Sequence, residues 1–341
     1  MNFLWLLPGL AGVSLLLTWL LRRYALSTSL IDTPNARSSH SVPTPRGGGV
    51  AIVISFLAAV PVLAFADLLP WSWAWAILGA GMGVAILGFM DDHEHISARW
   101  RLLGHFLAAA WVLFFLHGLG PVKVFGCLLD LGWFGNFLAV LYLVWLLNLY
   151  NFMDGIDGIA SVEALCACLG MSVIYWWVEQ PLLVWTPLVF SMAVVGFLFW
   201  NFPPARIFMG DAGSGFIGIM LGTFSLQAGA VSPQLFWAWL IMLGVFIVDA
   251  TFTLIRRLVR GDKVYEAHRS HAYQFASRQF GYHRPVTLAV AGINIFWLFP
   301  VALSVVLLDI DGLFGLALAY APLVWLAVRF HAGALEKFDA N

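Results

Sequence analysis

The sequence predicts an all-α polytopic membrane protein, a single transmembrane domain over residues 1–341 with about eleven transmembrane helices. The first observation is composition, because 62% of the residues are hydrophobic and only 10% are charged, against about a quarter in soluble domains. The second is the load of 17 Trp and 28 Phe, which suits lipid and its interfaces. The third is a series of apolar runs separated by short polar loops. A net charge of −1 and three cysteines exclude a basic nucleic-acid binder and a disulfide scaffold.

The apolar runs have about the length of a bilayer crossing, roughly 17–25 residues, and the shortest, 102–117, has 16. The runs are 3–21, 50–66, 73–90, 102–117, 134–150, 159–178, 183–200, 214–230, 235–255, 285–308 and 313–330. An odd number of crossings places the two termini on opposite sides. Every Lys and Arg except Lys123 lies in the odd-numbered connections or the C-terminal tail. The positive-inside rule therefore predicts a periplasmic N-terminus and a cytoplasmic C-terminus.

The polar residues concentrate in the predicted cytoplasmic loops 22–49, 91–101, 148–158, 201–214 and 256–285. In the first loop, Arg46 precedes three glycines at a helix start, where backbone N–H groups favour anions and glycines let a ligand approach. In the second, Asp91 and Asp92 directly follow an apolar run. Adjacent carboxylates repel each other unless a cation or a metal lies nearby.

The third loop, NLYNFMDGIDG, carries the sharpest local pattern. Asn148, Asn151 and Asp154 are spaced so that they share one helix face, and Asp157 continues the series. The two glycines of this loop weaken a helix and indicate a partly unwound turn. Oxygen ligands of this kind suit Mg²⁺, or Mn²⁺ in its place, rather than a softer metal.

The remaining two loops add a Gly-rich turn and a basic segment. In FMGDAGSG, Asp211 offers a carboxylate to a metal beside helix N–H groups free for phosphate, and Phe208 could stack on a flat base. In loop 256–285, His268 and His271 would face one way on a helix. Asp249, inside the ninth run, is an intramembrane carboxylate and therefore a functional candidate.

These loops also carry a resemblance to a known family. The motifs are DDxxxxxxR from Asp91, NxxNxxDGxDG from Asn148, FMGDxGSxxxG from Phe208 and RxxHxxxTPRGGG from Arg37, whose histidine is His40. They resemble those of the polyprenyl-phosphate N-acetylhexosamine-1-phosphate transferases, glycosyltransferase family 4, which start O antigen, teichoic acid and the first peptidoglycan lipid. The HRSHAYQ segment departs from the common H-x-H-H ending at Tyr273 and Gln274, and it looks like the O-antigen branch.

The resemblance implies roles for individual residues. Asp154 and Asp157 would line the uridine-diphosphate site with Phe208 on uracil, while Asp91 and Asp92 would lie nearest the lipid phosphate. The candidate catalytic residues are Asp91, Asp92, Asp154, Asp157 and His271. The candidate substrate-binding residues are Arg46, Asn148, Asp157, Phe208, Asp249, His268 and Arg269. The candidate Mg²⁺ ligands are Asn151 and Asp211.

The resulting functional hypothesis is Mg²⁺-dependent sugar-1-phosphate transfer from a UDP-N-acetylhexosamine to undecaprenyl phosphate, at the cytoplasmic face of a bacterial inner membrane. The sugar would be N-acetylglucosamine, N-acetylfucosamine or N-acetylquinovosamine, and the family suggests a homodimer; no nucleic-acid partner is expected. Two alternatives stay open: a peptidoglycan-type transferase, and a transporter of nucleotide-linked or lipid-linked sugar. Transporters usually bind near the bilayer midplane, whereas these acids cluster at predicted helix ends.

Overall fold

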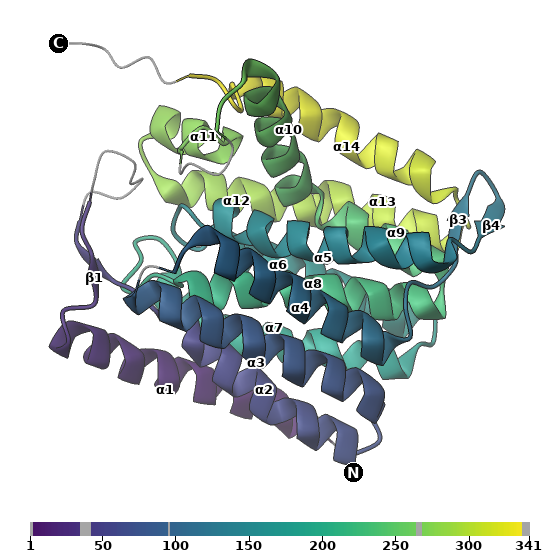
Figure 1. Ribbon diagram of the computed structural model, residues 1–341, viewed down its shortest axis with the longest axis horizontal. Helices are drawn as coiled ribbons and strands as arrows, with labels where there is room; N and C mark the ends of the chain where they lie inside the picture. The colour runs from purple at the N-terminus through teal and green to yellow at the C-terminus, as the bar shows by residue number, and fades with distance from the viewer. Residues whose placement is uncertain (1–2, 35–41, 95, 264–267, 336–341) are drawn as a thin grey trace.

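The computed structural model describes the whole chain except residues 1–2, 35–41, 95, 264–267 and 336–341, and it shows a bundle of long helices lying side by side (Figure 1). In the first half, a short 3₁₀ turn (Phe3–Trp5) leads into α1 (Leu6–Ser27), α2 (Val50–Phe65), α3 (Trp71–His93), α4 (Ala98–Leu116) and α5 (Gly132–Met153). In the second half follow α6 (Ile159–Trp177), α7 (Pro181–Asn201), α8 (Asp211–Val231), α9 (Pro233–Met242), α10 (Gly244–Arg260), α11 (Ala272–Phe280), α12 (His283–Ile293), a π turn (Asn294–Leu298), α13 (Phe299–Leu307) and α14 (Gly312–Arg329). Two antiparallel pairs of short strands complete the fold, β1 (Ile31–Asp32) with β2 (Thr44–Pro45) and β3 (Val122–Val124) with β4 (Cys127–Leu129).

The membrane-spanning capacity of these helices confirms the predicted fold class. Within the described residues, nine helices are long and apolar enough to cross a membrane, and the bent pair α9 and α10 would make a tenth. Helix α2 is apolar but has 16 residues, which rise about 24 Å and fall short of a full bilayer core. Each predicted run coincides with helix, so the chain is a multi-pass all-α membrane protein. The predicted eleven transmembrane helices would require both α2 and the bent pair of α9 and α10 to cross the membrane.

The ninth predicted run is not one straight span. The axis turns by 69° between α9 and α10, and Figure 1 shows α10 leaving the common direction of the bundle. The hydroxyl of Tyr320 donates to the carbonyl of Leu240 at 2.7 Å, the acceptor that a continuous helix would offer to the N–H of Gly244. A Cβ at Gly244 would lie 2.9 Å from the Tyr320 ring. A side chain from α14 thus occupies the place where α9 would have continued.

A second irregularity is the π turn between α12 and α13, which begins at Asn294. This fully buried side chain donates to Oε2 of Glu163 on α6 at 2.6 Å. Glu163 is itself completely buried, so its carboxyl lies inside the bundle and does not reach the membrane interface.

Helix α8 forms the centre of the bundle, and 89% of its most apolar 18-residue stretch is buried. Its glycines allow this, because a Cβ at Gly218 would lie 2.7 Å from the Cα of Leu147 on α5. Close backbone approach over small residues is the usual way in which membrane helices pack.

The loops of the bundle separate onto two ends (Figure 1). We call the end that holds β1, the α3–α4 turn and the start of α8 the site end, and the β3–β4 hairpin lies at the other. Helix α1 begins at the hairpin end and α14 finishes at the site end, so the predicted opposite placement of the termini has its counterpart in the bundle. Which end faces the cytoplasm stays a prediction.

Candidate functional site

The N-terminus of α8 is capped by a carboxylate from the end of α3. Oδ1 of Asp92 accepts the backbone N–H of Asp211 at 3.0 Å, and Oδ2 accepts that of Ala212 at 3.2 Å. The Asp92 side chain is only 1% exposed. The sequence predicted that the first N–H groups of α8 would be free for phosphate. That prediction is wrong for these two groups, because Asp92 already accepts from them.

The three glycines at the start of α2 serve the protein's own backbone. The N–H groups of Gly48 and Gly49 donate to the carbonyls of Phe208 and Met209 at 2.9 and 2.8 Å. A Cβ at Gly49 would lie 2.5 Å from the Cα of Gly213. We expected a ligand to approach the backbone here. That expectation is wrong for Gly48 and Gly49, because the backbone of the turn before α8 packs against them instead.

The packing of the start of α2 against the turn before α8 places two arginines among three carboxylates. Arg46 Nη2 lies 2.8 Å from Asp92 Oδ1 and 2.5 Å from Asp211 Oδ1. Arg101 Nη1 lies 2.5 Å from Asp91 Oδ2 and 3.8 Å from Asp211 Oδ2. Burial alone would lower the pKa of Arg46, but its carboxylate neighbours raise it above the ordinary value, so this guanidinium stays cationic. Asp211 is the residue that both arginines share.

The arginine that enters the site is not the one in the sequence motif. The DDxxxxxxR pattern ends at Arg99, which is exposed and lies 5.8 Å from the ring centroid of Trp100. Arg101 pairs with Asp91 instead. Successive helical residues are rotated by about 100°, so two positions apart face nearly opposite ways. Because α4 begins at Ala98, only one of the two arginines can face α3.

The asparagines of α5 meet Asp91 and Asp211 around a cavity of about 60 Å³. Asn151 Nδ2 donates to Ser214 Oγ at 3.1 Å, and Asn148 also lines the cavity. The predicted shared face of these two asparagines is thus confirmed. The sequence analysis missed His105, which lies 3.3 Å from Asn148. Its spacing of four residues from Arg101 on α4 was the available signal.

Asp154 and Asp157 lie in the turn after α5, which ends at Met153, so the predicted unwinding is confirmed. Burial raises the pKa of Asp154 well above its ordinary value, and the carboxylates of Asp211, Asp157 and Asp92 raise it further, while Arg46 opposes them. The carboxyl of Asp154 therefore holds a proton more readily than an exposed aspartate.

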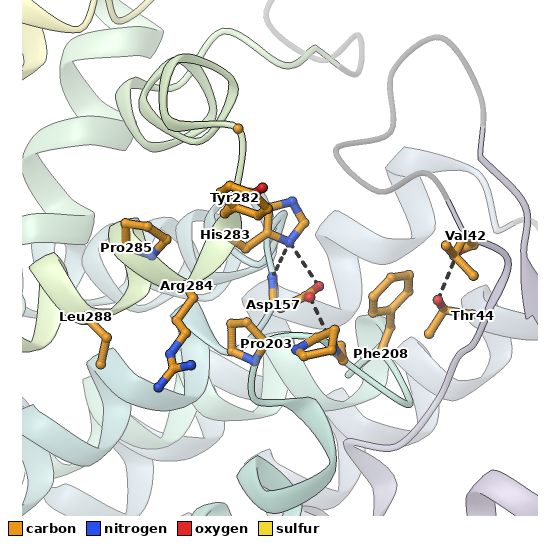
Figure 2. A pocket seen from close by; sticks show the side chains of 13 residues that line it. Val42, Thr44, Asp157, Pro203, Phe208, Tyr282, His283, Arg284, Pro285 and Leu288 are labelled. Carbon is orange, nitrogen blue, oxygen red and sulfur yellow. Dashed lines mark hydrogen bonds and ion pairs between the residues drawn. The ribbon is translucent and has the colours of Figure 1, made fainter.

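Asp157 points into a second, larger pocket of about 1020 Å³, shown in Figure 2. Its Oδ2 accepts the backbone N–H of Ala205 at 2.9 Å, and its Oδ1 lies 3.1 Å from His283 Nδ1. Phe208 and Arg284 also line this pocket. The predicted association of Asp157 with Phe208 therefore has a physical counterpart. His283 was missed because only its position in a basic loop marked it.

Asp249 holds the start of α11. Its two oxygens accept the backbone N–H groups of Ala272 at 2.9 Å and Tyr273 at 3.0 Å, and Oδ1 lies 3.4 Å from His271 Nδ1. The geometry shows Asp249 orienting His271 and capping α11; its contact with substrate stays a prediction.

The two histidines before α11 stack, with ring centroids 4.9 Å apart. Burial lowers the pKa of His268 to about 3, and the nearby His271 and Arg257 lower it too. His268 is therefore neutral at physiological pH and adds no positive charge. His271 Nε2 is buried and has no hydrogen-bond partner among the described residues. Arg269 lies half-buried in the same segment.

The departure from the family's usual histidine ending has a structural use. The hydroxyl of Tyr273 donates to the carbonyl of Phe152 at 3.0 Å, and Gln274 Oε1 accepts the N–H of His271 at 3.2 Å. Tyr273 therefore fastens α11 to the end of α5, and Gln274 caps the N-terminus of α11 itself. Of the RxxHxxxTPRGGG motif, Arg37 and His40 lie outside the described residues.

A multi-pass helical protein whose carboxylates, amides and arginines converge at one end of the bundle has the architecture of a membrane-embedded enzyme that handles anionic substrates. The family model described as glycosyl transferase family 4 matches residues 74–229. A Bacillus subtilis protein named as a probable undecaprenyl-phosphate N-acetylglucosaminyl 1-phosphate transferase is 32% identical, over 76% of this chain and 73% of the relative. The undecaprenyl-phosphate alpha-N-acetylglucosaminyl 1-phosphate transferase of Thermotoga maritima is 28% identical over 82% and 84%. A phospho-N-acetylmuramoyl-pentapeptide-transferase of Desulforudis audaxviator is 31% identical over 72% and 82%.

The chain therefore belongs to glycosyl transferase family 4, and it is a glycosyl-1-phosphate transferase. The resemblance to the polyprenyl-phosphate N-acetylhexosamine-1-phosphate transferases is confirmed.

Proposed function

We propose that this enzyme transfers an N-acetylhexosamine 1-phosphate from a UDP-sugar to undecaprenyl phosphate and releases UMP. The reaction would take place at the cytoplasmic face of a bacterial inner membrane. The observation that carries the proposal is the meeting of Asp91, Asn151 and Asp211 at the 60 Å³ cavity, at the same end of the bundle as the pocket lined by Phe208. The names of the relatives from Bacillus subtilis and Thermotoga maritima support the lipid acceptor and the sugar class.

The larger pocket suits the nucleotide part of the donor. Its volume of about 1020 Å³ is at the upper end of the range for small-molecule sites, about 300–1,000 Å³. Phe208 offers an aromatic face on which a uracil ring can stack, and Asp157 lies beside it (Figure 2). Arg284, from the start of α12, lines the same pocket and supplies a positive charge.

The donor set at the smaller cavity fits Mg²⁺. Among the described residues, no group of three or more His, Cys, Asp or Glu side chains is arranged to hold a metal, so a closed protein cage is not expected there. Mg²⁺ usually binds one or two protein oxygens and shares the rest of its shell with waters and substrate phosphates. Asn151 and Asp211 would hold it. When bound, the ion would neutralise charge on the pyrophosphate as the bond to UMP breaks.

The chain's own residues position the two phosphates. A lipid phosphate has a second pKa of about 6 and is largely dianionic at neutral pH, so its oxygen can attack the β-phosphorus directly while UMP leaves. Asp91, fixed by Arg101 and by the N–H of Ile96 at 2.9 Å, orients the acceptor and need not remove a proton. Arg46 brings positive charge to the same place.

For the downstream glycan we propose O antigen. This rests on the HRSHAYQ segment, in which Tyr273 fastens α11 to α5 and Gln274 caps the start of α11. The donor would then be an N-acetylated hexosamine, including N-acetylfucosamine or N-acetylquinovosamine. The relative from Desulforudis audaxviator favours a second candidate, a peptidoglycan-type transferase, and the two differ in donor.

The test is incubation of the purified protein with undecaprenyl phosphate, Mg²⁺ and a panel of UDP-sugars that includes UDP-N-acetylmuramoyl-pentapeptide. UMP and the lipid product are measured. Asp211→Ala should abolish Mg²⁺-dependent UMP release, whereas Asp130→Ala, an exposed aspartate before α5, should retain it. No UMP with any donor would overturn the proposed use of a UDP-sugar.

A further inference from the structure

The turn that carries Asp157 is fastened to the start of α12. Thr287 Oγ1 donates to the backbone carbonyl of Asp157 at 2.8 Å. The backbone N–H of Asp157 donates to His283 Nδ1 at 3.3 Å, and the same nitrogen lies 3.1 Å from Asp157 Oδ1. On the other side, Ala205 donates its N–H to Oδ2 at 2.9 Å. Figure 2 shows His283 above Asp157, with Phe208 further along the same pocket. The turn at Asp157 is therefore held at three points: its backbone N–H, its backbone carbonyl and its Oδ2.

The position of His283 is set by the backbone before it. Helix α11 ends at Phe280 and is followed by Gly281, which has a φ of +73°, a conformation that side-chain-bearing residues rarely adopt. Tyr282 follows in an extended conformation, and His283 opens α12. The side chains of His283 and Asp157 are 17% and 12% exposed. A pair this shielded is screened less by water and salt than a surface pair.

His283 belongs to the nucleotide pocket and not to the carboxylate cavity. It lines the pocket that contains Phe208, and it is not among the residues around Asp91 and Asp211. A residue that shapes only the donor's binding surface changes ground-state and transition-state binding equally. Such a change appears in KM and leaves kcat nearly unaltered.

We propose that His283 is a positioning residue for the nucleotide donor: it holds the turn that carries Asp157 against the pocket wall and thereby sets donor affinity. This inference rests on the proposed use of a UDP-sugar. The donor contacts Phe208 and Asp157, and His283 acts through Asp157. Because Asp249 fixes the opposite end of α11 beside His271, one short helix links the nucleotide pocket to the histidine segment.

The test compares three substitutions of His283 in the purified full-length protein. His283→Ala and His283→Gln both remove the acceptor at the Nδ1 position, whereas the Oδ1 of His283→Asn can accept the N–H of Asp157 in its place. We expect a KM for the UDP-sugar about tenfold higher in the first two, with kcat within about twofold, and a KM within about threefold of wild type for His283→Asn. UDP binding, measured by calorimetry without the lipid acceptor, should weaken by the same factors. Gln279→Ala, on the exposed side of α11, is the matched control.

Two kinds of failure are distinguishable. If the wild-type protein releases no UMP from any UDP-sugar, the proposed function fails. If it does so and His283→Gln keeps KM and UDP affinity within twofold of wild type, the positioning role is overturned. A loss of kcat with unchanged KM would also overturn it, because the residue would then act in the chemical step. Should His283→Ala not fold, the contrast between the Gln and Asn variants still decides.

Discussion

Replacing Asp92 by alanine should destabilise the protein by removing the cap of α8, in addition to any effect on turnover. The Asp92 carboxylate accepts two backbone N–H groups, from Asp211 and Ala212, and pairs with Arg46. Hydrogen bonds to charged groups contribute about 1.5–3 kcal/mol each, so the two N–H bonds represent about 3–6 kcal/mol. Arg46 keeps its contact with Asp211 and is about one-third exposed, so losing its Asp92 partner adds little. The expected loss in the free energy of unfolding is therefore near the lower end of this range, about 3 kcal/mol.

Thermal unfolding in detergent, followed by intrinsic Trp fluorescence, measures this loss. The melting temperature of Asp92→Asn should lie between those of wild type and Asp92→Ala, because its remaining carbonyl oxygen can accept one of the two N–H groups. Asp91→Asn is the matched comparison, since Asp91 accepts only one backbone N–H, from Ile96. We expect Asp91→Asn to keep UDP binding and most of its thermal stability while losing turnover.

The opposite pattern would refute this reasoning. If Asp92→Ala unfolds at the wild-type temperature but has lost turnover, the carboxylate does not hold α8 and acts in the reaction itself, as the sequence predicted. If Asp91→Asn turns over at the wild-type rate, Asp91 has no part in the chemistry.

Three further predictions follow from the turn after α5 and from α11. A Cβ at Gly155 would lie 2.2 Å from the hydroxyl oxygen of Tyr273; Gly155→Ala should therefore lower UMP release at least tenfold, and Tyr273→Phe in the same chain should restore part of it. Because burial raises the pKa of Asp154, its stabilising effect is largest below about pH 4 and is lost as pH rises. Asp154→Asn should flatten the fall in melting temperature between pH 5 and 8, and an unchanged slope would contradict this. If Asp249 acts through His271, Asp249→Asn and His271→Ala should lower kcat less than additively when combined; additive losses would show independent roles.

The arrangement of spans was predictable because each depends on a local property. Twenty apolar residues must be helical in a bilayer, since no water can satisfy an exposed backbone there, and every predicted run coincides with helix. The break between α9 and α10 was not predictable in the same way. It depends on Tyr320 donating to Leu240, a contact across 80 residues that leaves no trace in the periodicity of either segment.

The sequence predicted which residues come together at the site, but it predicted less well what each of them contacts. Alternation of the spans gathers the loops at one end, which brought Asp91, Asn151 and Asp211 together as expected. The purpose of the glycines was misread, because Gly49 packs against Gly213 rather than against a ligand. Sequence patterns do not distinguish a backbone that must approach a substrate from one that must approach another backbone.

The charged groups of the site must nearly balance one another, because the site lies at the end of an apolar bundle. Arg46 and Arg101 lie among the carboxylates of Asp91, Asp92 and Asp211, so the site nearly balances its own charge without substrate. Asp154, whose pKa is raised by burial, adds little negative charge when it holds its proton. Unpaired ions at the end of an apolar bundle would be expensive to keep out of water. In the proposed reaction the donor pyrophosphate and its Mg²⁺ would nearly cancel each other, whereas the lipid phosphate would add about two negative charges, which the two arginines would have to offset.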